Sequence, residues 1–268
     1  MRIVRACQEA DIESVAIYAD ADRHALHVKK ATEAYNIGPD PVAGYLNAHR
    51  IVNLAAATGC DALHPGYGFL SENPELASIC ERRGIKFIGP GAQVIRSMGN
   101  KIEARRSMQA AGIPVVPGSD ANLASVAEAV ALAANVGYPV MLKATSGGGG
   151  RGIRRCNSEI ELRRNYDRVL SEATKAFGSA EIFLEKCVPS PRHIEVQVLA
   201  DAHGNVVQLF ERDCSIQRRH QKLIEIAPAP QLSDSQRASI GDYAVKAARA
   251  VGYRNCLLYT SPSPRDHS

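Results

Sequence analysis

Residues 143–152 read KATSGGGGRG, a run of four glycines that follows a strand-like segment. Glycine has no Cβ and tolerates positive φ, so successive backbone N–H groups in such a run can curl around phosphate oxygens. Lys143 adds a positive charge at the end of the strand. Because no Gly-Lys-Ser/Thr follows and the run leads into another strand, the usual P-loop is excluded and a dinucleotide fingerprint is disfavoured. The segment predicts a mobile hairpin lid over a nucleotide, with a plain flexible linker as the alternative.

The flanks of the glycine run predict a small α+β domain. Strand-like segments lie at residues 139–144, 153–156 and 182–187. A long helix is expected in between, because Ser158 and Glu161 have the spacing of a capping box. We therefore expect residues 115–188 to form a separate α+β unit, followed by further strands at residues 194–198 and 206–210.

The first hundred residues alternate between strand-like and helix-like patterns. Strands are predicted at residues 14–19, 61–63 and 85–88, and helices at residues 45–58 and 74–83. Strands separated by helices predict parallel βαβ units. Such a domain normally begins with a strand, whereas residues 2–10 have a helical pattern. We therefore expect the first strand of the domain to be missing from this sequence.

The composition favours a globular protein over a membrane-spanning or disulfide-rich one. The chain has 268 residues, 45% hydrophobic and 22% charged, as in an ordinary globular protein. It has no apolar run of about 18 residues that would predict a membrane span. Its seven cysteines are scattered, which favours reduced thiols in the cytosol over a disulfide or zinc framework. The net charge of +4 is spread along the chain and gives little support to nucleic-acid binding.

A second polar segment, residues 211–222, reads ERDCSIQRRHQK. Its end brings together three cations, a histidine and two glutamines, namely Arg218, Arg219, Lys222, His220, Gln217 and Gln221. Following a strand, such a cluster predicts an anion site suited to bicarbonate or phosphoryl oxygens. A nucleic-acid patch is disfavoured because aromatic residues are not interleaved with the cations. A solvated charged turn remains the plainer alternative.

Three further patterns each have two interpretations. Residues 185–188, EKCV, end a strand before two prolines and could form a hinge that offers backbone groups to a purine. Residues 64–73, HPGYGFLSEN, form a glycine-rich turn at the carboxyl end of a strand, where α/β sheets place ligands. His193 and Glu195 alternate along a strand and share one face. A structural turn or ordinary packing explains each pattern equally well.

The last residues of the sequence have a different residue pattern from the rest of the chain. A last helix is predicted from the capping pattern Ser233-x-x-Gln236 to Gly252. From Cys256 onward the residues read CLLYTSPSPRDHS, which resembles a translated sequencing adapter. We expect residues 256–268 to be a non-native read-through tail, with a genuine flexible tail as the alternative.

Together these segments resemble the biotin carboxylase family, of ATP-grasp fold, across nearly all of residues 1–255. The motifs that carry the resemblance lie at residues 64–73, 88–90, 98–101, 143–152, 185–186, 192–201, 211–222 and 227–230. Several long motifs in the same order make a chance match implausible. Residues 25–31 and 152–156 look most like the separate biotin carboxylase subunit of two-subunit pyruvate carboxylases, with the acetyl-CoA carboxylase subunit close behind.

The resemblance implies an α/β fold with an N-terminal parallel βαβ domain, which is Rossmann-like and precedes an incomplete ATP-grasp fold. The implied divisions are an N-terminal biotin carboxylase domain at residues 1–98, linker helices with the ATP-grasp lid subdomain at 99–188, and the start of the C-terminal ATP-grasp subdomain at 189–255.

The implied chemistry is carboxylation of biotin. In this family ATP phosphorylates bicarbonate, and the resulting carboxyphosphate supplies CO2 to biotin on a carrier. The implied cofactors are ATP, Mg²⁺ or Mn²⁺, and biotin. The implied partners are a carboxyltransferase subunit, a biotin carboxyl carrier protein or domain and, in the full-length protein, a second copy. A cytoplasmic location is expected, with no nucleic-acid or membrane partner.

The resemblance also implies roles for individual residues. Lys101 and Lys143 would contact the ATP phosphates. The lid would contain Gly147, Gly148, Gly149 and Gly150. The hinge that holds adenine would contain Glu185, Lys186 and Val188, and His193 would lie on the ribose side. The implied catalytic residues are Lys222, which would neutralise bicarbonate, with Gln217 and His220 near the nucleotide.

The sequence departs from the family pattern in two ways. Thr145 and Ser146 begin the loop where many relatives have another glycine. The metal-binding glutamates, a nearby asparagine, the catalytic arginine and the glutamate near bicarbonate are expected beyond residue 255. We therefore expect no measurable carboxylase turnover from these 268 residues alone. A nucleotide-binding module without chemistry is an alternative. A second alternative is another ATP-grasp ligase, such as a carbamoyl-phosphate synthetase. The motifs at residues 192–201 and 211–222 argue against it.

Overall fold

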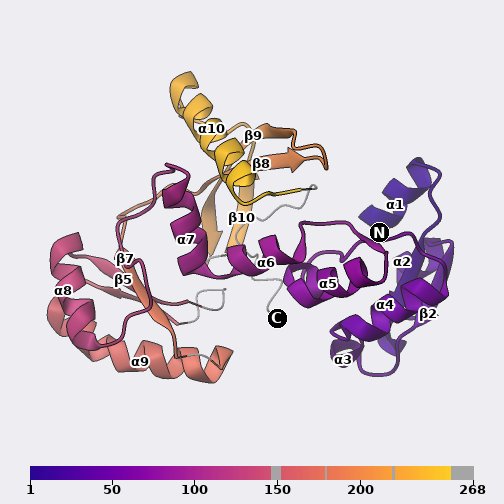
Figure 1. The fold of residues 1–268 in the computed structure, drawn as a ribbon, viewed down its shortest axis with the longest axis horizontal. Coiled ribbons are helices and arrows are strands. Elements are labelled where there is room, and N and C mark those ends of the chain that lie inside the picture. Colours follow the sequence, from indigo (N-terminus) through magenta and orange to yellow (C-terminus); the bar gives the residue numbers. More distant parts are fainter. Residues whose placement is uncertain (146–151, 179, 219–220, 255–268) are drawn as a thin grey trace. The chain divides into compact units, whose positions relative to one another are not determined.

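The structure is a computed structural model that describes residues 1–145, 152–178, 180–218 and 221–254 (Figure 1). The chain divides into two compact units, one of residues Met1–Arg96 and one that begins at Ser97. The predicted tail, residues 256–268, lies outside the described residues. None of the helices in the described part of the chain is both long and apolar enough to span a lipid bilayer.

The N-terminal unit contains short strands joined by helices. Its elements are α1 (Arg2–Glu9), β1 (Val15–Tyr18), α2 (Leu26–Lys30), β2 (Glu33–Asn36), α3 (Pro41–Tyr45), α4 (Ala48–Ala57), β3 (Ala62–Leu63), α5 (Pro74–Arg82), β4 (Lys86–Phe87) and the start of α6 (Ala92–Gly99). Strand β1 pairs in parallel with β2, and β3 pairs in parallel with β4. The predicted parallel βαβ arrangement is therefore confirmed.

Two details of this unit differ from the sequence prediction. The helix predicted at residues 45–58 begins only at Ala48, because the Asn47 side chain accepts a hydrogen bond from the Arg50 N–H and caps α4 there. Strand β2, which reads EAYN, was not predicted because it has no β-branched residue and three of its four residues are exposed.

The turn at residues 64–73 holds Gly66 and Gly68 at φ of 76° and 80°, which requires glycine.

The second unit contains two three-stranded antiparallel sheets with their helices. Its elements are α7 (Lys101–Ala110), α8 (Val126–Val136), β5 (Val140–Ala144), β6 (Ile153–Cys156), α9 (Glu159–Phe177), β7 (Ile182–Lys186), β8 (Ile194–Ala200), β9 (Val206–Arg218), β10 (Gln221–Ile226) and α10 (Asp234–Ala250). The first sheet has the order β6-β5-β7 and the second has the order β10-β9-β8.

Helices α8 and α9 cover the first sheet and enclose its core (Figure 1). Leu142, Leu162 and Leu184 are fully buried there. The Ser158 hydroxyl accepts from the Glu161 N–H and so begins α9. The predicted capping box is only half present, because the Glu161 carboxylate accepts from the backbone N–H of Asn157 instead. The core of this sheet therefore holds β5, and with it Lys143, in a fixed position.

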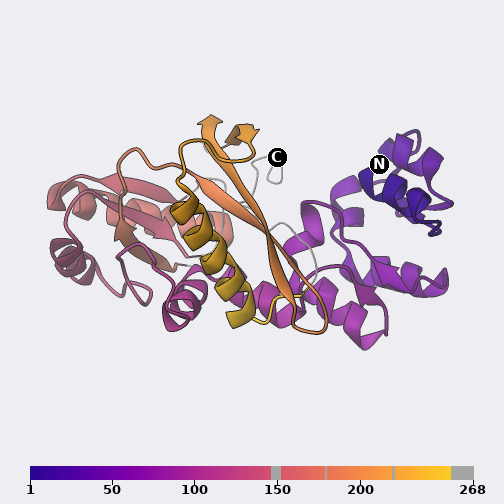
Figure 2. The same cartoon turned by 90° about the horizontal axis from the view of Figure 1, so that it is seen from above.

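The second sheet is packed against α10, which lies along it (Figure 2). The predicted capping box at Ser233 and Gln236 is confirmed. Strand β9 is thirteen residues long and pairs with β10, so residues 211–218 and 221–222 of the polar segment lie on two antiparallel strands and not after a strand. The strand pattern was hidden because two of its buried positions carry carboxylates, Glu211 and Asp213. Burial of these charges is possible because each is paired with an arginine.

Candidate functional site

The two lysines predicted to bind phosphates are linked through Thr145. Lys101 is the first residue of α7, and its Nζ donates to the Thr145 carbonyl oxygen at 3.2 Å. Thr145 follows the last residue of β5 and lies two residues after Lys143. The contact therefore places the start of α7 at the end of β5. Asn100 accepts hydrogen bonds from the N–H groups of Ile102 and Glu103 and so caps the start of α7.

Lys143 is paired with a residue of the predicted adenine hinge. Its Nζ forms a salt bridge with Glu185 across the antiparallel pair of β5 and β7. Lys186, next along the hinge, donates from Nζ to the carbonyl oxygens of Gly137 and Tyr138 at 2.8 and 3.0 Å. The Lys186 ammonium therefore anchors the hinge to the turn before β5, and Val188 follows the strand in an exposed position.

The glycine segment joins two paired strands. Strands β5 and β6 are antiparallel, with Lys143 opposite Ile153, and the Ala144 N–H donates to the Gly152 carbonyl at 2.9 Å. The predicted lid residues Gly147, Gly148, Gly149 and Gly150 lie outside the described residues, as does His220.

Two other predicted nucleotide residues contact each other. The Gln217 amide nitrogen lies 2.7 Å from His193 Nδ1 and donates to the Cys214 carbonyl at 2.8 Å. Since an amide nitrogen is a donor, Nδ1 is the acceptor in this contact. The ring of His193 is therefore held in one orientation by β9.

Lys222 belongs to a network of two cations and two carboxylates. Its Nζ lies 2.5 Å from Glu195 Oε2 and 3.8 Å from Glu225 Oε1. Arg212, which is opposite Glu195 in the strand register, lies 2.5 Å from Glu195 Oε1 and 3.5 Å from Glu225 Oε2. The side chains of Lys222 and Glu195 are each only 9% exposed. The sequence pointed to Lys222 and Glu195 separately but not to Arg212 or Glu225. Arg212 shares a face of β9 with Cys214, a signal that becomes visible only once the strand is known.

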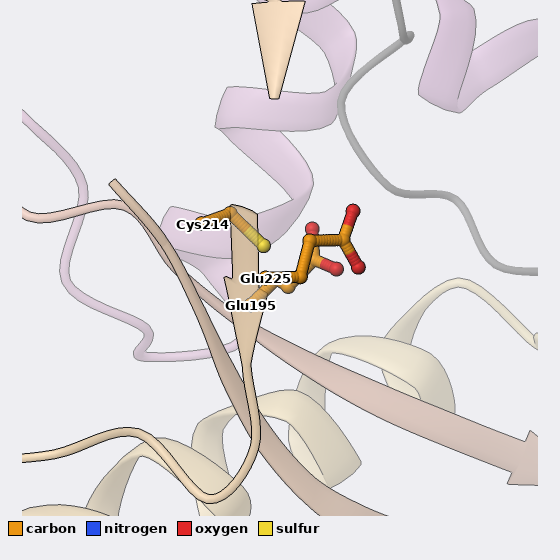
Figure 3. Close-up of side chains that lie close together, drawn as sticks. All are labelled: Glu195, Cys214 and Glu225. Atoms are coloured by element: carbon orange, nitrogen blue, oxygen red, sulfur yellow. The ribbon is translucent and has the colours of Figure 1, made fainter. Parts of the chain in front are cut away.

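Cys214 lies beside the two carboxylates of this network (Figure 3). The ligand atoms of Glu195, Cys214 and Glu225 are all within 4.8 Å of one another, which is close enough to hold a metal ion. However, burial and the nearby Glu195 charge raise the pKa of the Cys214 thiol to about 11, so it is protonated near neutral pH. Both carboxylates are already paired with Arg212 and Lys222. The group is therefore a neutralised ion-pair cluster and a poor fit to a metal ion.

Asp213 connects β9 to the segment that leads into α10. It accepts hydrogen bonds from the Ser215 N–H at 2.9 Å and from Arg192 at 2.8 Å, and Arg192 also donates to the Pro230 carbonyl. The hydrogen bonds from Ser215, followed by that from Arg192, lower the pKa of Asp213 to about 2. The carboxylate therefore stabilises the fold in its charged form.

We expect the contribution of Asp213 to stability to be lost in acid. The folded-state pKa of about 2 lies below the ordinary value of 3.8, so the contribution is full above about pH 4 and falls as the pH is lowered toward 2. Urea unfolding of the wild type and of Asp213→Asn at a series of pH values measures it. The difference in unfolding free energy should be constant above about pH 4 and shrink between pH 4 and pH 2. A difference that is independent of pH would contradict the assignment.

Comparison with known proteins gives the family. Residues 1–95 match the family described as biotin carboxylase, N-terminal domain, and residues 100–257 match that described as carbamoyl-phosphate synthase L chain, ATP binding domain. The 2-oxoglutarate carboxylase small subunit of Hydrogenobacter thermophilus is 55% identical over 252 residues, which are 94% of this chain and 53% of that protein. Biotin carboxylase of Halalkalibacterium halodurans is 54% identical over 95% of this chain and 57% of that protein.

Solved structures of biotin carboxylases are similar to this chain over most of its length. The biotin carboxylase domain dimer of the Hydrogenobacter thermophilus enzyme, in complex with MgADP, ADP and bicarbonate, matches with a TM-score of 0.90 at 55% identity, over 94% of this chain and 56% of that chain. Biotin carboxylase from Campylobacter jejuni, in a β,γ-ATP complex, matches with a TM-score of 0.91 at 46% identity, over 94% of this chain and 57% of that chain. The chain spans about half the length of the curated relatives it matches. The predicted fold class and family resemblance are confirmed: the chain belongs to the biotin carboxylase family of ATP-grasp fold.

Proposed function

We propose that this chain carries the nucleotide- and bicarbonate-binding part of an enzyme that carboxylates biotin on a carrier. The reaction converts ATP, bicarbonate and biotinyl carrier into ADP, phosphate and carboxybiotinyl carrier. The observation that carries the proposal is the contact of Lys101 with Thr145, which brings the start of α7 to the end of the strand that presents Lys143. A lysine of α7 that is held at the end of a strand carrying a second lysine suits the phosphates of ATP.

The remaining nucleotide contacts are proposed around the same sheet. Within the second unit we propose residues 99–188 as the linker and lid part and residues 189–255 as the start of the second ATP-grasp part. Glu185, Lys186 and Val188 would face adenine, and His193 with Gln217 would face the ribose side. The Lys186 and Cys187 N–H groups donate to the carbonyls of Pro117 and Pro139. The hinge carbonyls and Val188 are therefore the groups proposed to meet the purine.

Bicarbonate is proposed to bind at Lys222. A lysine ammonium has three N–H donors, and the two carboxylates that flank Lys222 accept at most two of them in this arrangement. The third donor would contact bicarbonate, with Gln217 and His220 as the neighbouring proposed catalytic residues. Since the Lys222 ammonium is largely buried and already paired with Glu195, its proposed contribution is an N–H donor held in a fixed position for bicarbonate.

A divalent cation, Mg²⁺ or Mn²⁺, is part of the proposed reaction, in which it would neutralise phosphate charge. The described residues offer one group of three side chains at ligand spacing, Glu195, Cys214 and Glu225. That group does not fit a magnesium ion, which prefers oxygen ligands, because one member is a protonated thiol and the others are ion-paired. We therefore assign no metal ligand among the described residues.

The proposed partners are a biotin carboxyl carrier protein or domain and a carboxyltransferase subunit. The Hydrogenobacter thermophilus relative is named as the small subunit of its carboxylase, which supports an enzyme of more than one kind of chain. A homodimer is proposed because the Hydrogenobacter thermophilus domain was solved as a dimer. The cytosol is the proposed location, since all six cysteines in the described ranges are free thiols.

Calorimetric titration with ATP tests the nucleotide site. We expect the 268-residue chain to bind ATP and Lys143→Met to bind it about 10- to 100-fold more weakly, as for the loss of a hydrogen bond to a charged group. Adenosine affinity should fall much less, because adenosine has no phosphate and only Glu185, the partner of Lys143, lies in the proposed hinge. An equal loss of affinity for ATP and adenosine would contradict the role of Lys143.

Phosphate release tests the chemistry. In the full-length protein we expect ATP cleavage that requires bicarbonate and increases with biotin. Binding of ATP without any bicarbonate-dependent phosphate release would contradict the carboxylase proposal and favour a nucleotide-binding module without chemistry.

A further inference from the structure

Thr145 is held by three different parts of the chain. Its N–H donates to the Glu181 carbonyl at 3.0 Å, its carbonyl accepts from Lys101 Nζ at 3.2 Å, and its hydroxyl donates to Asn122 Oδ1 at 2.5 Å. The residue is only 1% exposed. Its backbone and its side chain are therefore both fixed, immediately before the run of Ser146 and four glycines in the sequence.

Asn122 is in turn held by a well-bonded segment. On one side the segment pairs with β7, where the Ser119 N–H donates to Leu184 and the Leu123 N–H donates to Ile182, at 2.8 and 2.9 Å. On the other side Asp120 is bonded to α7, since its carbonyl accepts from Arg106 at 2.7 Å and its carboxylate lies 3.6 Å from Arg105. Asn122 therefore belongs to a segment, residues 119–123, that is bonded both to α7 and to β7.

We propose that Asn122 is a positioning residue for the nucleotide phosphates and that it acts through Thr145 on Lys101. The Asn122 amide fixes the Thr145 hydroxyl, and the Thr145 carbonyl then fixes the Lys101 ammonium at the end of the strand that carries Lys143. The inference rests on the proposed function, because it requires the two lysines to bind ATP. It assigns a role to Asn122 that neither its sequence context nor the family motifs predict.

The physical reason is the flexibility of lysine. A lysine side chain loses conformational entropy when it is immobilised. A fixed acceptor that immobilises it before ATP arrives removes much of that cost from binding. Without the Asn122 bond, the Thr145 peptide would keep its backbone contacts with Glu181 and Lys101 but lose the bond that fixes its side chain. The carbonyl oxygen that accepts from the Lys101 ammonium would then be less firmly held.

Matched substitutions at Thr145 and Asn122 test the proposal in the 268-residue chain. Thr145→Val keeps the shape but removes the hydroxyl, Thr145→Ser keeps the hydroxyl, and Asn122→Ala removes the acceptor. Affinities for ATP and for adenosine are measured by calorimetry. We expect Thr145→Val and Asn122→Ala each to weaken ATP binding roughly tenfold, the loss expected of about one hydrogen bond. Adenosine binding should not change, and Thr145→Ser should resemble the wild type.

A double-mutant cycle tests whether the effect passes through Lys101. In a Lys101→Met background, Thr145→Val should cause no further loss of ATP affinity. An undiminished loss in that background would overturn the proposal, and so would an equal loss for ATP and adenosine, which indicates a purely structural role. If the wild type binds ATP and both single variants bind it equally well, the inference fails and the proposed function stands. If the wild type does not bind ATP, both fail.

Discussion

Glu195→Ala is expected to destabilise the β8–β9–β10 sheet by about 3–5 kcal/mol, the usual cost of removing one partner from a buried ion pair. The carboxylate of Glu195 lies 2.5 Å from both Lys222 and Arg212. Its removal leaves two cations with only Glu225, at 3.5 and 3.8 Å, and the Lys222 side chain is only 9% exposed. Hydrogen exchange of peptides from this sheet, measured across a urea series, would report the loss. A local measurement is needed because a chain of two units need not unfold in a single step.

Glu225→Gln is the matched control. Its carboxylate belongs to the same network, but its side chain is 40% exposed and its two contacts are longer. We expect a loss of less than about 1 kcal/mol, as for a solvent-exposed ion pair. Equal effects of the two substitutions would mean that Lys222 does not depend on Glu195. In that case the proposed bicarbonate site would need another explanation for its buried ammonium group.

Local patterns in the sequence predicted most of the elements that surround the candidate site. The strands on both sides of the glycine run and the helix after Ser233 were predicted because alternation, glycine and capping residues act over a few positions. The β9–β10 hairpin was missed because buried Glu211 and Asp213 read as surface residues. Their arginine partners, Arg237 and Arg192, lie 26 and 21 positions away, beyond any local pattern.

The same limit applies to the site itself. The family motifs identified Lys143 and Glu185, as well as His193 and Gln217, but did not indicate that each pair is in contact. Partners that come from other elements, such as Asn122 for Thr145, were not predicted at all. Side chains separated by more than twenty positions meet only through the register of strands and the packing of loops on them. A single sequence contains no direct signal for that.

Gly118→Ala is expected to disrupt the β7 edge of the β6-β5-β7 sheet. Gly118 pairs with Glu185, and a Cβ at this position would overlap the Leu184 carbonyl oxygen and lie 2.8 Å from the Glu185 Cα. Both neighbours are backbone atoms that cannot rotate away, so the two segments must separate. The separation breaks the bonds from the Ser119 N–H to Leu184 and from the Lys186 N–H to Pro117. At about 1 kcal/mol for each bond, plus packing strain, we expect a loss of about 3 kcal/mol.

The displacement should also weaken ATP binding, because Glu185 holds Lys143 and lies in the proposed adenine hinge. Hydrogen exchange in β7 and titration with ATP would measure the two effects. Gly99→Ala is the control, since a Cβ there meets nothing within 4 Å and the substitution should be nearly neutral. If Gly118→Ala matched this control in both measurements, the segment before α8 would not be held against β7. The hinge would then have to be positioned by β5 alone, and the link from Asn122 through Thr145 to Lys101 would lose the rigid support on which it depends.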